Sequence, residues 1–409
     1  MAGGASVGLA ALRGGFVRTA RAASSGARPR CYLQIIPSGG MDAVYTLDPK
    51  TTREVARGID VPYRASAIVD AGAVRLAPTF GALKRWGPRF AVVNGFRQNS
   101  ANHQSGLAHV TRCKSHTAPS MPTLLDILGT RRGDEAVGAM SIAADFATAF
   151  SPQYLGQPGK YFYGNNAGVF DHLDRADPED LRTAARVMQG QAESLGRHRL
   201  SAQELTTAEN LRMSSALLAR AADVPRFAPV KWKHDMDERL EGGTDLQRAL
   251  WLLEHKLTRC VAVSVGRQNF DTHADNPYQA DMTGYLAFVL DKLFEELDRR
   301  VVDGHPLSDQ IVVVVGSEIG RFPRINAANG KDHFPQAPYL LFGAPFRPGM
   351  YGGTDPEMIA MPVSATTGRP ERGGHMLAID DLGTTLLAID GVNPEVYGYT
   401  GQRLRFVEA

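Results

Sequence analysis

The feature that most constrains this chain is a set of short β-branched runs that alternate with segments of helical periodicity. The runs span residues 31–36, 90–93, 261–265 and 311–315, and the last reads Ile-Val-Val-Val-Val. Continuous apolar runs of this length are typical of strands that are buried on both faces of a parallel sheet. Their alternation with helices predicts an α/β fold, in which a doubly wound, mainly parallel sheet carries helices on both faces.

Three segments carry helix signals. Asp177 and Pro178 provide a cap and a first-turn proline, and Thr244 with Gln247 forms a capping-box pattern. Residues 282–297 place five apolar side chains on one helical face, namely Leu286, Val289, Leu290, Leu293 and Leu297. We interpret the helix-rich stretch at 171–258 as an insertion in a single domain that spans residues 31–409. Ligands of such sheets bind beyond the carboxyl ends of the strands, so a site is expected in the loops that follow them.

Composition excludes several classes of protein. The 409 residues are 43% hydrophobic, and the formal net charge is only +2. Lys and Arg are spread without blocks, which argues against a nucleic-acid partner. No run of about 18 apolar residues occurs, so no membrane span is expected. The three cysteines include no C-x-x-C pair and predict neither a disulfide framework nor a thiolate zinc site.

Residues 1–30 differ in composition from the rest of the chain. They hold five Arg, no acidic residue, and many Ala and Gly. This composition is typical of a targeting leader, and our leading interpretation is a signal peptide with export to the periplasm or the exterior. A transit peptide of an organellar protein and a disordered tail on a cytoplasmic protein are the alternatives.

Four loops that follow the predicted strands hold side chains able to bind a metal ion or take part in catalysis. The candidate metal ligands are Asp42, Asp271, His273, Glu318, Asp332 and His333, and the candidate catalytic residues are Ser100, His103 and Arg321. Asp271 and His273 are two residues apart, so both can face one side of an extended loop. Glu318 directly follows an apolar strand, where a carboxylate needs a cation or an arginine as its partner.

Several of these residues also have a purely structural interpretation. Asp42 and Asp271 are good capping residues, and a single histidine such as His103 is common on a protein surface. Taken together, the candidates form an oxygen-rich set of N and O ligands that suits Zn²⁺, with Mn²⁺ or Ca²⁺ as alternatives. Their number is sufficient for one or two ions. The sequence therefore predicts a divalent-metal site at the carboxyl edge of the sheet.

Four strings of the sequence are characteristic as a set. PSGGMDAVYTLDPK, NFDTHADN, VVVVGSEIGR and GKDHFPQAPYLLFG occur in this order. They resemble domain-of-unknown-function family 1501, whose members look like distant relatives of alkaline phosphatases and sulfatases, and the resemblance covers roughly residues 31–400. The resemblance implies an alkaline-phosphatase-like fold. It also implies roles for individual residues: a first-strand metal ligand (Asp42), a pair on one ion (Asp271 and His273), and ligands near the metals (Glu318 and His333, with Asp332 adjacent).

The chain departs from the pattern of that superfamily at two points. Glu318 stands where the superfamily more often has an Asp-His pair, which leaves the second ion open. The string Cys113-Lys-Ser-His-Thr does not match the C-x-P-x-R motif of a formylglycine sulfatase. The loop in which the superfamily carries its nucleophile offers Ser100 and Ser105, and the sequence does not choose between them.

The candidate ligands and the resemblance lead to one hypothesis on function. They predict a metal-dependent hydrolase or transferase that acts on a phosphate-type or sulfate-type ester of a small molecule or glycan. Arg97, Arg267 or Arg321 would bind the oxyanion, since a guanidinium group matches such oxygens in a bidentate manner. The alternative is an exported, non-catalytic binding or scaffold protein that keeps the fold.

Overall fold

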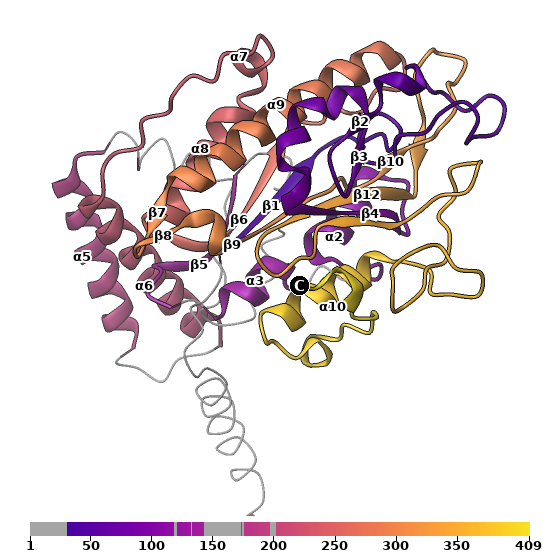
Figure 1. The fold of residues 1–409 in the computed structure, drawn as a ribbon. Coiled ribbons are helices and arrows are strands. Elements are labelled where there is room, and N and C mark those ends of the chain that lie inside the picture. The colour runs from indigo at the N-terminus through magenta and orange to yellow at the C-terminus, as the bar shows by residue number, and fades with distance from the viewer. Residues whose placement is uncertain (1–30, 118–120, 132, 143–172, 174–175, 197–201) are drawn as a thin grey trace, which may run out of the picture.

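A seven-stranded sheet lies at the centre of the computed structural model, which describes residues 31–117, 121–131, 133–142, 173, 176–196 and 202–409. The strand order is β13-β4-β12-β9-β1-β6-β5 (Figure 1). The strands are β1 (Cys31–Pro37), β4 (Phe90–Arg97), β5 (Val137–Ile142), β6 (Thr258–Val265), β9 (Ile311–Val315), β12 (Gln336–Phe342) and β13 (Gly349–Gly352). β12 is antiparallel to both of its neighbours, and the other pairings are parallel. All strands except β12 therefore end at the same edge of the sheet.

The helices of the described residues are α2 (His103–Arg112), α3 (Leu124–Gly129), α5 (Pro178–Leu195), α6 (Ala202–Asp223), α7 (Asp237–Leu240), α8 (Gly242–Glu254), α9 (Asn276–Arg299) and α10 (Ile379–Ile389). Short two-residue strands are β2 (Val69–Asp70), β3 (Arg75–Leu76), β7 (Val301–Val302), β8 (His305–Pro306), β10 (Gly320–Arg321) and β11 (His333–Phe334). The 3₁₀ segments are η1 (Ala65–Ala67), η2 (Pro78–Arg89), η5 (Leu307–Asp309), η6 (Pro394–Tyr397) and η7 (Arg405–Val407).

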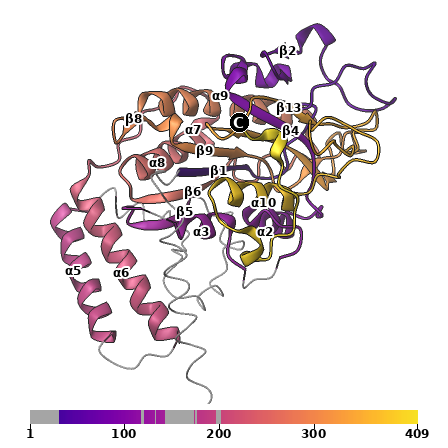
Figure 2. The same cartoon turned by 60° about the horizontal axis from the view of Figure 1, so that its bottom comes forward.

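The two faces of the sheet carry separate hydrophobic cores, because alternate side chains of a strand point to opposite faces. Leu33 and Ile35 of β1 join the core that contains apolar residues of η2, α8 and α9. Tyr32 and Ile36 of the same strand join the core that contains apolar residues of α2, α3 and α10. Figure 2 shows these helices on either side of the sheet, while α5 and α6 lie beside the edge at β5. The predicted α/β class, with a mainly parallel sheet and helices on both faces, is confirmed.

The predicted helix starts are confirmed in one case and wrong in another. Asp177 caps α5 by accepting a hydrogen bond from the backbone N–H of Glu179, and Pro178 follows it in the first turn. The capping box predicted at Thr244 does not form, because α8 already begins at Gly242. The Asp237 carboxylate accepts the backbone N–H of Gly243 at 2.7 Å and so takes the role predicted for Thr244.

Helix α9, the longest in the part of the chain that the structure describes, contains the segment predicted at 282–297. Asp275 caps it by accepting the backbone N–H of Tyr278, and the five predicted apolar residues are all buried in the core beneath it. The predicted leader at 1–30 lies outside the described residues. The described part of the predicted insertion at 171–258 holds α5 to α8, and the division into a single domain with this insertion stays a prediction.

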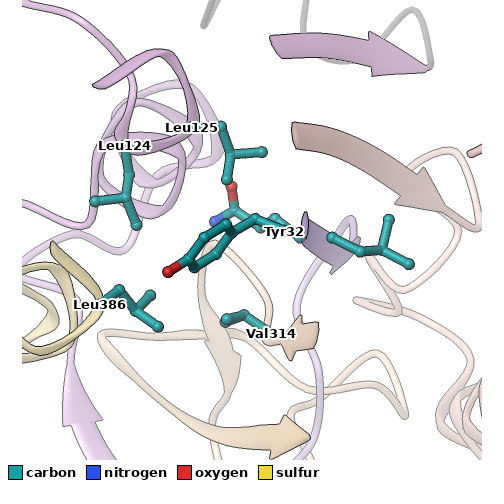
Figure 3. A pocket seen from close by; sticks show the side chains of 7 residues that line it. Tyr32, Leu124, Leu125, Val314 and Leu386 are labelled. Atoms are coloured by element: carbon teal, nitrogen blue, oxygen red, sulfur yellow. The ribbon is translucent and has the colours of Figure 1, made fainter. Parts of the chain in front are cut away.

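A small apolar cavity lies between β1, β9, α3 and α10. Tyr32, Leu124, Leu125, Val314 and Leu386 line it (Figure 3). Its volume is about 10 Å³, which is no more than one water molecule needs, so it is a packing defect of the core and not a substrate site. Within the described ranges, no helix combines the length and the apolar character that a membrane span requires.

Candidate metal centre

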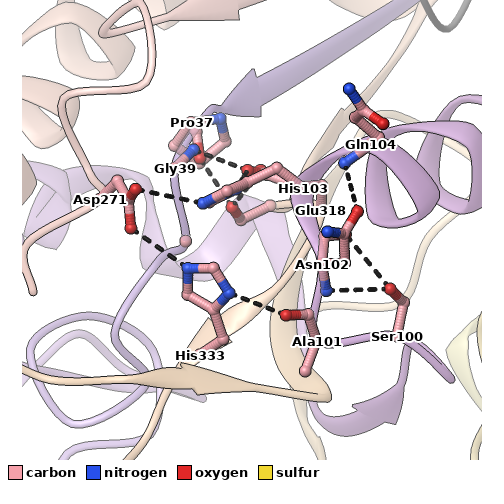
Figure 4. A network of polar contacts seen from close by, with 12 residues as sticks. Pro37, Gly39, Ser100, Ala101, Asn102, His103, Gln104, Asp271, Glu318 and His333 are labelled. Carbon is pink, nitrogen blue, oxygen red and sulfur yellow. Dashed lines mark hydrogen bonds and ion pairs between the residues drawn. The ribbon is translucent and has the colours of Figure 1, made fainter.

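The loops that follow β1, β4, β6 and β9 meet at the carboxyl edge of the sheet. Helix α2 follows β4 and begins with His103, the loop after β6 carries Asp271 and His273, and Glu318 follows β9. His333 belongs to β11, which pairs with β10 in a short hairpin after β9. Figure 4 shows His103, Asp271, Glu318 and His333 pointing toward one another from these separate segments.

Three imidazoles and one carboxylate form the centre of the site. Asp271 Oδ2 lies 3.2 Å from His103 Nε2, and Asp271 Oδ1 lies 3.2 Å from His273 Nε2 and 3.3 Å from His333 Nε2. The Nε2 atoms of His273 and His333 are 2.8 Å apart. The four side chains are between 21% and 44% exposed, so solvent and a substrate have access to the cluster from one side.

Each imidazole is oriented through its Nδ1 atom by a group that accepts a hydrogen bond. His103 Nδ1 lies 2.8 Å from Glu318 Oε1, and His273 Nδ1 lies 3.1 Å from Asp332 Oδ1. His333 Nδ1 donates to the backbone carbonyl of Ala101 at 2.7 Å. A neutral imidazole with its proton on Nδ1 keeps a lone pair on Nε2. In that form each of the three imidazoles would present its Nε2 lone pair to Asp271 and to the other imidazoles.

Part of this arrangement fits a zinc ion, because the donor atoms of His103, Asp271 and His333 all lie within 4.8 Å of one another. Zinc binds imidazole nitrogen and carboxylate oxygen at about 2.0–2.1 Å, which places neighbouring ligand atoms about 3.3 Å apart. The distances from Asp271 to the three imidazoles match this value. The Nε2 atoms of His273 and His333 lie 2.8 Å apart, close enough for one to donate a hydrogen bond to the other. His103, Asp271 and His333 are thus the residues that would hold the ion, and His273 adjoins them through His333.

Glu318 lies behind His103 and is completely buried. Its Oε1 atom accepts the backbone N–H of Gly39 at 2.7 Å in addition to His103 Nδ1, and its Oε2 atom lies 2.8 Å from the Ser317 hydroxyl. A Cβ atom at Gly106 of α2 would lie only 2.7 Å from the backbone oxygen of Glu318. Glycine at this position therefore lets α2 approach closely enough to bring His103 onto the carboxylate.

Arg321 supports Asp271 from inside the protein. Its Nη2 atom lies 2.5 Å from Asp271 Oδ1 and also donates to the Gly39 carbonyl, while Nη1 donates to the Lys331 carbonyl at 3.0 Å. Burial alone would raise the pKa of Asp271, but the hydrogen bonds from His103 and Arg321 hold that pKa well below its usual range. The Asp271 and Glu318 carboxylates raise the pKa of His103 to about 9. Asp271 is therefore ionised at neutral pH.

Asp42 is not part of this cluster. Its Oδ1 atom accepts the backbone N–H groups of Val44 and Tyr45, and its Oδ2 atom lies 2.6 Å from the ammonium group of Lys331, which is also completely buried. Asp332 contacts the cluster only through His273 Nδ1, at the solvent-exposed side. Of the six predicted metal ligands, the structure brings together Asp271, His273 and His333, and it places Glu318 and Asp332 behind imidazoles.

The predicted catalytic residues occupy three different positions. His103 joins the predicted ligands at the centre. The Ser100 hydroxyl lies 2.6 Å from that of Ser105 and accepts the backbone N–H of Asn102, on the side of Ala101 that faces away from His333 (Figure 4). The Arg321 guanidinium is buried beneath Asp271 and is not directed at solvent.

Three groups in and around the site were not among the sequence candidates. The Ala101 carbonyl orients His333, but a backbone atom carries no signal in the sequence. Lys331 stands directly before Asp332 and His333, and a lysine in a polar loop is an ordinary surface residue until the fold shows it to be buried. Asp60, the second carboxylate beside Lys331, lies in a stretch of mostly exposed or partly buried residues without any distinctive pattern.

The fold and the cluster together define a class of protein: a mainly parallel α/β protein with a candidate metal centre at the carboxyl ends of its strands. The model of one protein family, described as "Protein of unknown function (DUF1501)", matches residues 31–408, and the chain belongs to this family. The resemblance drawn from the four sequence strings is thereby confirmed. A comparison with curated proteins found no match.

Solved structures of similar fold come from several bacteria. They include a protein in the alkaline phosphatase superfamily from Vibrio parahaemolyticus (11% identity, 94% of this chain and 72% of that chain, TM-score 0.37). The lipoteichoic acid synthase LtaP from Listeria monocytogenes shares 9% identity over 96% of this chain and 82% of its own, with a TM-score of 0.43. The lipooligosaccharide phosphoethanolamine transferase EptA from Neisseria meningitidis shares 12% identity over 93% of this chain and 61% of its own, with a TM-score of 0.37.

Proposed function

We propose that this chain is a zinc-dependent enzyme that hydrolyses or transfers a phosphate-type or sulfate-type ester. The observation that carries the proposal is the convergence of three imidazole Nε2 atoms on the Asp271 carboxylate, each imidazole being held through Nδ1. Zinc bound by such ligands supplies a Lewis acid and lowers the pKa of a bound water toward about 7.

The residues around the centre favour an anionic substrate. Asp271 is the candidate ligand that carries a negative charge, and the buried Arg321 already compensates that charge. A divalent ion would therefore keep most of its positive charge toward the open side, where an ester oxygen can approach. Glu318, Asp332 and the Ala101 carbonyl do not touch the substrate in this proposal, because they fix the orientation of the imidazoles.

Water is the nucleophile that the geometry favours over Ser100. The hydroxyl groups of Ser100 and Ser105 are hydrogen-bonded to each other and to Asn102, at the amino end of α2. The cluster, by contrast, is open to solvent. The absence of a free serine nucleophile among Ser100 and Ser105 also favours the second candidate function, a binding protein that keeps the metal but has no turnover.

Turnover of aryl esters tests the proposal. Zinc-loaded wild type should hydrolyse 4-nitrophenyl phosphate or 4-nitrophenyl sulfate, and His333→Ala should abolish this activity. His305→Ala, which changes an exposed histidine of β8, is the matched control and should retain it. A wild type that binds zinc but hydrolyses neither ester, nor a set of phosphodiesters and glycan sulfates, would support the binding protein instead.

Zinc affinity should depend on pH through His103. The pKa of about 9 means that this imidazole carries a proton at neutral pH in the metal-free protein, and the proton must leave before Nε2 can bind an ion. Binding therefore releases a proton, and the Kd for zinc should fall about tenfold per pH unit until pH 9 and then level off. Competition with a chelator of known affinity measures this. A Kd that is constant from pH 7 to pH 9 would show that His103 is not a ligand.

Glu318→Gln should weaken zinc binding about 10–100-fold, because the amide orients His103 less firmly than a carboxylate does. The amide also removes one of the two charges that raise the pKa of His103, so the pH at which the affinity levels off should fall. Asp332→Asn is the matched control, since Asp332 holds His273 in the same way but is 61% exposed. Water can replace the Asp332 carboxylate at this exposed position, so Asp332→Asn should weaken zinc binding by less than about tenfold.

A further inference from the structure

Lys331 is completely buried, and its ammonium group lies between two carboxylates. Nζ is 2.6 Å from Asp42 Oδ2 and 3.0 Å from Asp60 Oδ2. The Tyr45 ring lies 4.6 Å from Nζ, and the Tyr45 hydroxyl donates to Asp60 Oδ2 at 3.1 Å. Two carboxylate groups therefore face a single ammonium group.

The same residue is joined to the candidate metal centre through its backbone. The Lys331 N–H donates to the Thr272 carbonyl at 3.0 Å, between Asp271 and His273 in sequence. The Lys331 carbonyl accepts from Arg321, which holds Asp271. His333 follows two residues later. One short segment therefore carries both a candidate ligand of the first ion and a buried internal cation.

The groups around the ammonium have the chemistry of a cation site. Asp42, Asp60 and the Tyr45 hydroxyl present oxygen atoms, which are the ligands that Mg²⁺, Mn²⁺ and Ca²⁺ prefer. Asn276 adds an amide that donates to Asp60 and to Tyr45, and its buried Oδ1 atom has no hydrogen-bond partner. A divalent ion in place of the ammonium group would balance the two carboxylate charges completely.

We propose that the Lys331 ammonium group takes the place of a metal cation between Asp42 and Asp60, so that the chain binds a metal ion only at the candidate metal centre. This inference rests on the proposed function for the identity of the first site. Asp42, predicted from the sequence as a metal ligand, then still binds a cation, but one that the chain itself supplies. Removal of the ammonium group opens an all-oxygen site at Asp42 and Asp60 for one divalent ion.

Metal stoichiometry in Lys331→Ala tests this proposal. Both wild type and variant are loaded with zinc, freed of excess, and then equilibrated with Mn²⁺, which does not displace zinc from nitrogen-rich ligands. Elemental analysis should give one zinc and no manganese in wild type, and one zinc and one manganese in Lys331→Ala. The manganese should be lost again in the double variant that also carries Asp42→Asn.

Lys256→Ala is the matched control. Lys256 also lies between two carboxylates, 3.0 Å from Asp134 and 2.9 Å from Asp303, but at the protein surface. Water solvates those carboxylates once the lysine is gone, so this variant should bind Mn²⁺ at least about tenfold more weakly than Lys331→Ala does.

The outcomes separate this inference from the proposed function. Wild type that takes up manganese beside its zinc overturns the inference, and so does a folded Lys331→Ala that takes up none. Wild type without zinc overturns the proposed function. The manganese content of Lys331→Ala then still tests the inference on Lys331. If the variant is unstable, Mn²⁺ should raise its Tm by more than about 5 °C and leave that of wild type unchanged. Failure to fold with and without Mn²⁺ also overturns the inference.

Discussion

His333→Ala is expected to reduce the zinc content of the purified protein from about one ion per chain to less than about a tenth of that. His333 is one of the candidate imidazole ligands, and its Nε2 lies 3.3 Å from Asp271 Oδ1. Loss of a group that merely orients a ligand weakens binding about 10–100-fold, so loss of the ligand itself should exceed that range. Elemental analysis after gel filtration measures the content.

The control for this result is His305→Ala, which removes an exposed imidazole from β8 and should leave the zinc content unchanged. Circular dichroism should show that both variants keep their helices, because His333 is only partly buried and packs at the edge of the fold. Equal zinc in His333→Ala and wild type would remove His333 from the ligand set. Metal-free wild type, even after incubation with zinc, would refute the metal centre as a whole.

Arg321→Met should lower the free energy of unfolding by about 3 kcal/mol. The substitution leaves Asp271 without its cation and the carbonyl groups of Gly39 and Lys331 without a donor. Asp271 is a third exposed and regains some water, which keeps the loss below that of a wholly buried pair. Urea unfolding of the zinc-free protein measures the change as a lower midpoint at constant slope.

Arg186→Ala serves as the comparison for Arg321→Met. Arg186 and Glu179 form an ion pair at 2.9 Å on α5, with both side chains about two-thirds exposed. Surface pairs of this kind contribute about 0–1 kcal/mol, so the midpoint should hardly move. If Arg321→Met is as stable as Arg186→Ala, then Asp271 does not depend on the guanidinium group, and its low pKa must be attributed to His103 alone.

The sequence was informative wherever a pattern is local and repeated. The β-branched runs predicted β1, β4, β6 and β9, because a strand buried on both faces must be apolar along its whole length. The periodicity of residues 282–297 predicted the core of α9 for the same reason. The capping box at Thr244 failed, because Asp237, which lies before α8 in the chain, binds the backbone of Gly243 instead.

For the candidate site, the sequence indicated the loops but not the roles of their side chains. The rule that ligands lie beyond the carboxyl ends of parallel strands led to Asp271, His273 and His333, which the structure brings within 3.3 Å of one another. Glu318 was predicted as a metal ligand, and the structure places its Oε1 atom on His103 Nδ1. A buried carboxylate is stabilised either by binding a metal ion or by accepting a hydrogen bond from an imidazole. The residue type alone could therefore not distinguish these two roles of Glu318.

The sequence by itself determined the α/β class, the family, and the edge of the sheet where polar side chains gather. These follow from hydrophobic periodicity and from chain direction, which are properties of consecutive residues. The tertiary structure alone decided that Lys331 is buried between Asp42 and Asp60, and that His103 joins Asp271. Such pairings join residues that are far apart in the chain, and their energies depend on distance and burial, which exist only once the loops have met.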